Sequence, residues 1–371
     1  MAKTVLILGG SFAGLHVAHG LLKKNDKDLK VVLVSKNSHF YWNLASVRAI
    51  VPGVIKDEEI FKSLSSALSK YPETSYELII GSAEAADFDA KTVRISVPGS
   101  ADRTIEYDQL VLATGSRCPD TSVPWKAEHG YEETIELLHS TGAKVEAAKH
   151  IVVAGAGATG IETAGELGFA FGKTKEIVLL CAGDKVLGGD SIAASASNEL
   201  KKLNVKIEYG AKVESTAPAG EKTEITLANC KDKIVTDLYL PTMGLVPNSE
   251  YVNAKYLDSV RKTVNVDEFL RVEGTTNVWA AGDLVSKPRA GFMITQKQAG
   301  TVINNVLAAL AGREPTVHKG MPFDILACST GRSRGVGRAG FVKMPSIGVW
   351  AVKARQLGIN MIPGYINGSV A

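Results

Sequence analysis

The segment Val5-Leu6-Ile7-Leu8-Gly9-Gly10-Ser11-Phe12-Ala13-Gly14 decides the fold. Four apolar residues with high strand propensity run directly into a glycine-rich turn, and residues 15–22 then read as a helix. This order opens a dinucleotide-binding βαβ unit, because backbone amides of the turn and the helix N-terminus hold a pyrophosphate. Ser11 replaces the middle glycine of G-x-G-x-x-G, so the segment alone leaves a plain strand–loop–helix open.

A second segment repeats the arrangement and makes the nucleotide interpretation specific. Residues 150–160 read HIVVAGAGATG, a full G-x-G-x-x-G between an apolar strand and a helix. In both units the ribose position lies 21 residues after the last glycine, at Ser35 and at Cys181. Neither residue is the acid typical of NAD sites, and Lys36 follows the first while Asp184 and Lys185 follow the second. The sequence therefore leaves NADH and NADPH both open.

Three further stretches fit a cofactor site. An apolar strand ends in Ala113-Thr114-Gly115, whose small residues let the backbone pass beside a cofactor. Asp283 follows a strand and a glycine, where a carboxylate either accepts from a polyol or caps a helix. The aromatic run 39–42 precedes Asn43 and packs on the core or on a flat cofactor, while Arg48 is placed to reach a phosphate.

Composition predicts a globular protein of two or three domains in a reducing, cytoplasmic setting. The 371 residues are 45% hydrophobic and 22% charged, and no apolar run reaches the ~20 residues of a membrane span. No two of the four cysteines have CxxC spacing, which argues against a zinc site and a local redox dithiol. We expect no metal and no nucleic acid. Residues 316–371 carry net charge +6, which predicts either a solvated face or peripheral contact with an anionic membrane.

Together these motifs resemble the two-dinucleotide-binding-domain flavoproteins, such as glutathione reductase, type II NADH dehydrogenase and apoptosis-inducing factor. Within them the chain is most similar to fungal apoptosis-inducing-factor-like and ferroptosis-suppressor-like proteins. Residues 40–48, 155–162, 331–337, 352–355 and 363–368 carry that similarity. The resemblance implies an α/β fold with two Rossmann-like domains and a small C-terminal α+β segment. We expect FAD to be held by residues 1–118 and 245–315, NAD(P)H by 119–244, and the flavin to be covered by 316–371.

The motifs and the resemblance together predict the residues of the site. The cofactor-binding positions are Gly9, Gly10, Ser11, Phe12, Ala13, Gly14, Ser35, Lys36, Asn43, Arg48, Ala83, Ala113, Thr114, Gly115, Gly155, Gly157, Thr159, Gly160, Glu162, Gly244, Gly282 and Asp283. By resemblance, Glu162 lies near the nicotinamide and Lys353 near the flavin, both as catalytic residues. Their alternatives are a first-turn acid that complements the helix dipole and a solvent-facing charge on a surface helix.

The expected function is transfer of a hydride from NAD(P)H to FAD, then of electrons directly to a quinone-like acceptor. The alternatives are a sensor whose redox state controls its interactions and a monooxygenase. The protein is expected to be a monomer or a homodimer. A helix is expected from Pro345 to Gly358, with Ile347, Trp350, Ala351 and Ala354 on one apolar face. That face either lies on a membrane or packs on the protein.

Overall fold

The first half of the chain and a later segment build one parallel sheet. Its strands are β1 (Lys3–Leu8), β2 (Leu29–Ser35), β5 (Tyr76–Ile80), β9 (Gln109–Leu112) and β19 (Val278–Ala280), in the order β19-β9-β1-β2-β5. The computed structural model describes residues 2–228, 232–285 and 289–371. Because β19 pairs with β9, residues far beyond the second glycine turn complete the first domain.

Alternate residues of β1 enter different cores, as the period of a strand requires. Val5 and Ile7 share a core with α1 (Phe12–Leu22), against which α8 (Phe292–Leu310) packs. Leu6 and Leu8 share the core of the opposite face with Val93 and Ile95. That face is covered by the antiparallel strands β6 (Ser82–Asp87), β7 (Thr92–Ser96) and β8 (Arg103–Glu106). Both faces of β1 are therefore buried, which explains its unbroken apolar run.

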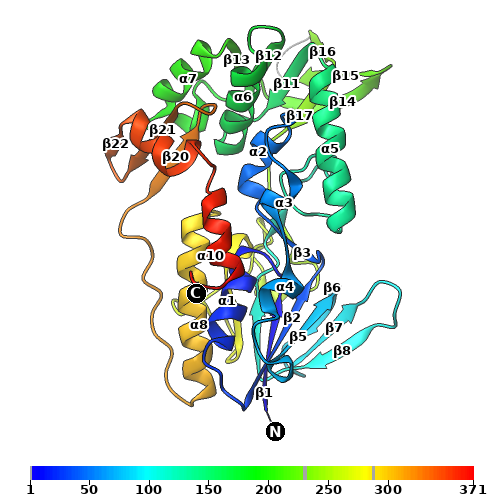
Figure 1. Cartoon of the computed structure of the whole chain (residues 1–371), viewed down its shortest axis with the longest axis vertical. Coiled ribbons are helices and arrows are strands. Elements are labelled where there is room, and N and C mark those ends of the chain that lie inside the picture. Colours follow the sequence, from blue (N-terminus) through cyan, green and yellow to red (C-terminus); the bar gives the residue numbers. More distant parts are fainter. Residues whose placement is uncertain (1, 229–231, 286–288) are drawn as a thin grey trace.

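The second unit has the same design. The strands β11 (His150–Ala154), β12 (Glu176–Cys181), β13 (Val205–Tyr209) and β17 (Leu238–Pro241) form a parallel sheet in the order β13-β12-β11-β17. Helices α6 (Ala158–Phe171) and α7 (Ala193–Lys202) pack against it, and the antiparallel β14 (Val213–Ala219), β15 (Lys222–Leu227) and β16 (Lys233–Thr236) complete the lobe. Figure 1 shows the two sheets in separate lobes, and β10 (Ser116–Arg117) pairs with β18 (Val246–Pro247) where the chain crosses between them.

The remaining elements surround these sheets. They are β3 (His39–Tyr41), α2 (Ser46–Ala49), α3 (Asp57–Ile60), β4 (Phe61–Ser63), α4 (Leu64–Leu68) and α5 (Tyr131–Ala147), with 3₁₀ turns at Asn43–Ala45, Glu73–Ser75, Val186–Gly189, Ala254–Tyr256 and Gly282–Leu284. The aromatic run is buried: the ring of Phe12 contacts the rings of Phe40, Trp42 and Tyr365. It packs on the protein's own core.

The C-terminal segment spans both lobes. Strands β20 (Ile325–Ser329), β21 (Gly335–Ala339) and β22 (Val342–Met344) form a sheet against α6 and α7. The chain continues through α9 (Ser346–Val349), a π turn at Trp350–Ala354 and a 3₁₀ turn at Ile359–Met361. Then α10 (Ile362–Ile366) returns to α1, beside α8 (Figure 1).

The helix expected over 345–358 forms only in part, and its single apolar face is wrong. The helical stretch ends at Ala354, before the predicted end, and the chain turns through Leu357 (φ +49°) and Gly358 (φ +75°) into the next 3₁₀ turn. The π turn changes the angular period, so Ala354 is buried while Ile347 is 74% exposed. The Trp350 indole donates to the Arg332 carbonyl instead of facing a partner surface.

Candidate functional site

The first glycine turn is shaped by contacts that allow no side chain. Gly9 has φ +109°, and a Cβ there would lie 2.3 Å from the Ala113 carbonyl oxygen. A Cβ at Gly14 would lie 1.7 Å from the Gly9 carbonyl oxygen, so only glycine lets α1 approach β1 this closely. Ser11 occupies the N-cap of α1 without a side-chain hydrogen bond to the helix, and the first turn holds no acid. These features fit a pyrophosphate at the N-terminus of α1.

The other residues predicted to bind the first cofactor are small or already contact protein groups. Ser35 Oγ donates to the Asn37 carbonyl at 2.6 Å and lies beneath Gly10. Lys36 pairs with Glu128, 3.5 Å away, and Asn43 donates to the Trp125 carbonyl. Ala83 lies half-buried in β6, and Ala13 is buried in α1.

Asp283 lies at the junction of the crossing segments. Its Oδ2 accepts from Ser116 Oγ at 3.0 Å and from Lys126 Nζ at 2.8 Å. Burial opposes ionisation of Asp283, but Lys126 and Ser116 outweigh it and hold its pKa below the usual value. A half-buried carboxylate that stays ionised fits the acceptor role expected toward a polyol. The amide of the neighbouring Gly282 (φ +84°) donates to Gln298 Oε1, in the second turn of α8.

The Ala113-Thr114-Gly115 segment is hydrogen-bonded to the second segment that crosses between the lobes, at Asn248. Thr114 Oγ1 donates to the Asn248 carbonyl, and Gly115 has φ +66°. Gly244 (φ +74°) lies against Pro119 on the other crossing. The two crossings are therefore tied to each other beside Asp283.

The second glycine turn is a close copy of the first. Gly155 has φ +103°, and a Cβ at Gly160 would lie 1.8 Å from the Gly155 carbonyl oxygen. A Cβ at Gly157 would meet no atom within 4 Å, so this position is open on the outside of the turn. Thr159 lies half-buried in the first turn of α6, which holds no acid. This turn also fits a dinucleotide.

Glu162 and Lys353 meet, although 191 positions separate them in the chain. Lys353 Nζ lies 2.6 Å from Glu162 Oε1 and 2.6 Å from the Ala327 carbonyl oxygen, and Glu162 also accepts from the Ser329 amide. Burial disfavours the charge on Lys353, but Glu162 outweighs burial and raises its pKa. Glu162 is 7% exposed and lies beyond the first turn of α6, while Lys353 is half-buried and turned toward Glu162.

Arg48 has a different partner from the phosphate expected of it. Its guanidinium donates to Glu166 Oε1 at 2.6 Å and 2.9 Å, and to the carbonyls of Ala354 and Arg355. Glu166 is fully buried in α6, and its second oxygen lies 3.5 Å from Arg332. Glu166 was missed because a glutamate four residues after Glu162 reads as an ordinary helical position. Its one signal is that it lies one helical turn after Glu162, on the same face of α6.

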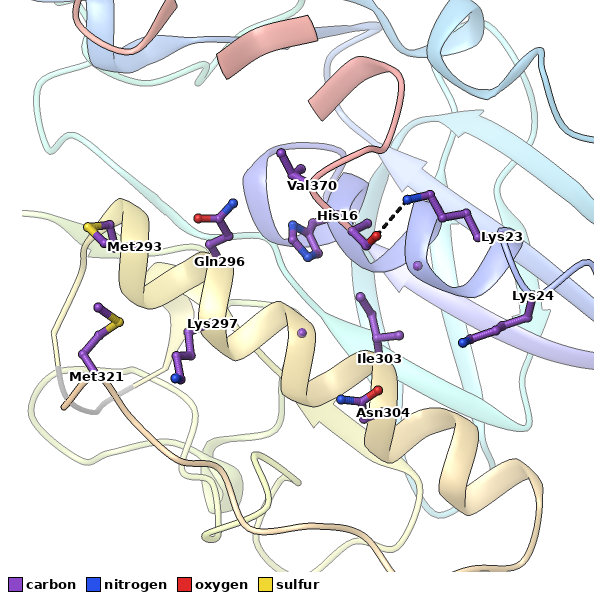
Figure 2. Close-up of a pocket in the computed structure, with 13 residues that line it drawn as sticks. His16, Lys23, Lys24, Met293, Gln296, Lys297, Ile303, Asn304, Met321 and Val370 are labelled. Carbon is purple, nitrogen blue, oxygen red and sulfur yellow. Dashed lines mark hydrogen bonds between the residues drawn. The ribbon is translucent and has the colours of Figure 1, made fainter. Parts of the chain in front are cut away.

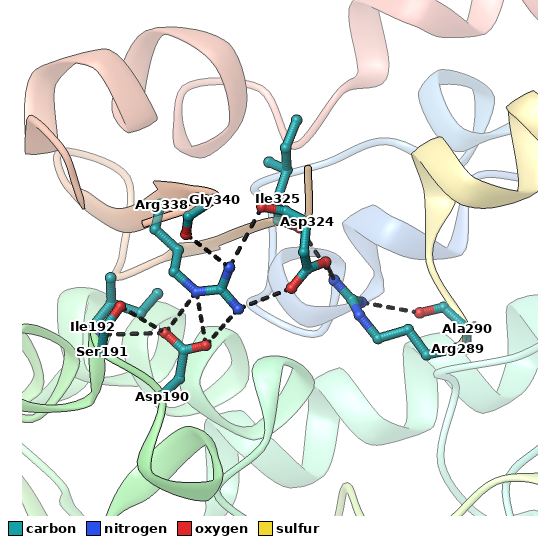
Figure 3. A network of polar contacts seen from close by, with 9 residues as sticks. All are labelled: Asp190, Ser191, Ile192, Arg289, Ala290, Asp324, Ile325, Arg338 and Gly340. Carbon is teal, nitrogen blue, oxygen red and sulfur yellow. Dashed lines mark hydrogen bonds and ion pairs between the residues drawn. The ribbon is translucent and has the colours of Figure 1, made fainter. Parts of the chain in front are cut away.

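A second charged cluster joins the C-terminal sheet to both lobes (Figure 3). Arg338 of β21 contacts both oxygens of Asp190, at 2.8 Å and 3.0 Å from its Nε, and pairs with Asp324 at 2.8 Å. Asp324 also pairs with Arg289, just before α8. The hydrogen bond from Arg338 lowers the pKa of Asp190, so the cluster stays charged at neutral pH.

Comparison with known proteins places this geometry in a family. Residues 3–309 match the protein family described as "Pyridine nucleotide-disulphide oxidoreductase". The oxidoreductase ptaL of Pestalotiopsis fici is 36% identical over 99% of this chain and 100% of its own length. Ferroptosis suppressor protein 1 of Xenopus tropicalis is 24% identical over 96% of this chain and 94% of its own length.

Solved structures show the same fold. The sulfide:quinone oxidoreductase of Aquifex aeolicus superposes with TM-score 0.79 at 17% identity, covering 100% of this chain and 93% of that one. The water-forming NADH oxidase of Lactobacillus brevis gives 0.75 at 20% identity, covering 91% and 75%. Both support the predicted α/β fold with two Rossmann-like domains. No helix within the described ranges is long and apolar enough to cross a membrane. The chain belongs to the pyridine nucleotide-disulphide oxidoreductase family, and its cofactors are FAD and NAD(P)H.

Proposed function

We propose that this chain oxidises NAD(P)H through FAD and passes the electrons directly to a quinone-like acceptor, without a protein dithiol. When bound, FAD supplies the redox chemistry, taking a hydride from the nicotinamide and returning two electrons to the acceptor. The observation that carries the proposal is the ion pair between buried Glu162 and half-buried Lys353, beside a single inert thiol. The protein supplies placement and charge.

The thiols of the described chain are unsuited to electron relay. Cys118, Cys181 and Cys328 are all free, and 49 or more positions separate any two of the four cysteines in the sequence. Cys328 lies next to Ser329 of the Glu162 site, and burial raises its pKa to about 12. Since the thiolate is the reactive form, Cys328 stays a protonated, unreactive thiol at neutral pH.

Lys353 is suited to stabilise negative charge at the site. An ammonium has three donors, and two of them are used by Glu162 and the Ala327 carbonyl. We propose that the third donates to the acceptor oxygen that gains charge, which is worth most in a site shielded from water. Glu162 holds Lys353 in place and keeps it protonated.

The test is anaerobic reduction followed by reoxidation. Holoprotein mixed with NADH or NADPH in a stopped-flow instrument should lose its flavin absorbance, and menadione should restore it at the rate of steady-state turnover. Bleaching with little turnover by any quinone would instead favour the alternative of a redox sensor. Absence of bleaching by either nicotinamide would overturn the proposal.

We also propose that a lipid-soluble acceptor is met at an anionic membrane through the C-terminal sheet. Phe341 is fully exposed at the turn between β21 and β22, and Val342 and Ile347 are largely exposed. Lys343, which follows Val342 in the sequence, is exposed as well. Each basic residue near such a surface adds about 1 kcal/mol of attraction. The protein should float with anionic liposomes at low salt, and Phe341→Asp should abolish flotation. No flotation of the unaltered protein would contradict membrane docking.

A further inference from the structure

A cavity of about 580 Å³ opens between α1, α8 and the end of the described chain (Figure 2). None of its lining residues belongs to a glycine turn or to the Glu162–Lys353 pair. Its volume falls within the range of small-molecule sites, about 300–1,000 Å³. The proposed function above does not use it.

The polar part of the wall is cationic. Lys23, Lys24 and Lys297 line the cavity, and no side-chain carboxylate is among its described lining residues. Lys23 donates to the carbonyls of Gly368 and Ala371. Within the described ranges, Lys24 and Lys297 make no ion pair. The wall therefore favours an anion.

A buried, neutral imidazole lies behind the cavity wall. His16 is 4% exposed, and its Nδ1 has no hydrogen-bond partner within the described structure. Burial, helped by Lys23, lowers the pKa of His16 to about 4, so the ring is neutral. Figure 2 shows it in the space between α1 and α8. A neutral ring beside the lysines adds no positive charge of its own, so the charge that a ligand meets here comes from the lysines.

The remaining wall is apolar and adaptable. Met293 and Met321 face the cavity from α8 and from the segment before β20, with Ile303 and Val370 further along. Methionine side chains adjust to ligands of different shape. A Cβ on Gly300 would meet no atom within 4 Å, so the floor of the cavity is open at this position.

We propose that this cavity binds an amphiphilic organic anion, with its carboxylate or sulfonate toward the lysines and an apolar body along the methionine wall. Inorganic anions lack the apolar body and neutral quinones lack the charge, so both should bind less well. Two kinds of ligand share this chemistry: a small aromatic acid, and an anionic lipid with its acyl chain as the apolar body.

The open glycine allows a sharp test. FAD-loaded protein should bind 1-anilinonaphthalene-8-sulfonate saturably, with enhanced fluorescence. Gly300→Leu should weaken binding about tenfold or more, because a Cβ there meets no atom and the rest of the side chain occupies the cavity. Lys297→Gln should weaken it about fivefold. The control is Gly348→Leu, a helical position in α9 that is equally open but lies outside the cavity. Met321→Trp narrows the opposite wall and serves if Gly300→Leu loses its flavin.

Competition then identifies the source. Displacement of the probe by 1-naphthoate supports an aromatic acid, and displacement by oleate or by phosphatidylserine vesicles supports a lipid. The proposal is overturned if none of these three competitors displaces the probe, or if inorganic phosphate displaces it equally well. It is also overturned if Gly300→Leu and Gly348→Leu bind the probe with equal affinity.

Discussion

Helices α1 and α6 both follow a glycine-rich turn, but their buried polar side chains make different contacts. Two residues after the last glycine of its turn, α1 carries His16 and α6 carries Glu162, and both side chains are buried. Glu162 has a charged partner in Lys353, whereas His16 Nδ1 has none. The backbone design is shared, so the side chain at this position decides which helix carries the charged pair.

The next turn of each helix widens the difference. Six residues after the last glycine, α1 has Gly20 and α6 has Glu166. A Cβ at Gly20 would lie 2.3 Å from Ile303, so this glycine lets α8 pack directly on α1. Glu166 instead reaches Arg48 of the other lobe. Thus α1 is packed within its own lobe, while α6 is joined by charge to the rest of the molecule.

The largest expected effect comes from valine at the two turns. Gly14→Val places a side chain on the Gly9 carbonyl, so we expect complete loss of FAD and of the yellow colour. Gly157→Val meets no protein atom and should keep FAD, yet lose reduction by NAD(P)H because the side chain enters the space of the dinucleotide. Absorbance spectra and dithionite reduction measure both. Loss of FAD from Gly157→Val would mean that the two sites are reversed or interdependent.

Breaking the link that only α6 makes should cost most in stability. Arg48→Met leaves the buried Glu166 without its partner, which should lower the free energy of unfolding by about 3–5 kcal/mol. The exposed pair Lys202–Glu199 is the control, where Lys202→Met should cost less than ~1 kcal/mol. Denaturant unfolding measures both. A loss for Arg48→Met no larger than that of the control would rule out the interlobe role.

Glu162→Gln removes the negative charge from the Glu162–Lys353 pair and keeps the shape of the side chain. We expect turnover to fall about 10²-fold with FAD retained. Because Glu162 is what raises the pKa of Lys353, the variant should lose its remaining activity at lower pH than the unaltered enzyme does on the alkaline side. Rate profiles from pH 6 to 10 measure this. An unchanged alkaline limb would show that Lys353 takes no part in turnover.

The smallest effect concerns the histidines that α1 carries and α6 lacks. Burial lowers the pKa of His16 and of His19 to about 4, from about 6.5 in the unfolded chain. Their neutral packing therefore stabilises the fold fully above pH 6.5, and this contribution is lost as the pH falls toward 4. Between pH 7.5 and 6, His16→Gln with His19→Gln should lose about 1–2 kcal/mol less than the unaltered protein. Equal losses would contradict buried neutral histidines.

Sequence reasoning found the two turns because their geometry is local. A positive φ at Gly9 and the close approach at Gly14 require glycine whatever lies around them, so spacing alone indicates them. The partner of Arg48 could not be found this way, because Glu166 is 118 positions away. The apolar face over 347–354 failed for another reason: the π turn breaks the 3.6-residue period on which the prediction relied.

Counting electrons tests the central claim most directly. Holoprotein is titrated anaerobically with dithionite, and the electrons taken up per FAD are counted from the flavin absorbance and the titrant consumed. Direct transfer without a dithiol predicts two electrons per FAD, returned in full to menadione. Four electrons per FAD would reveal a redox-active disulfide and contradict the account.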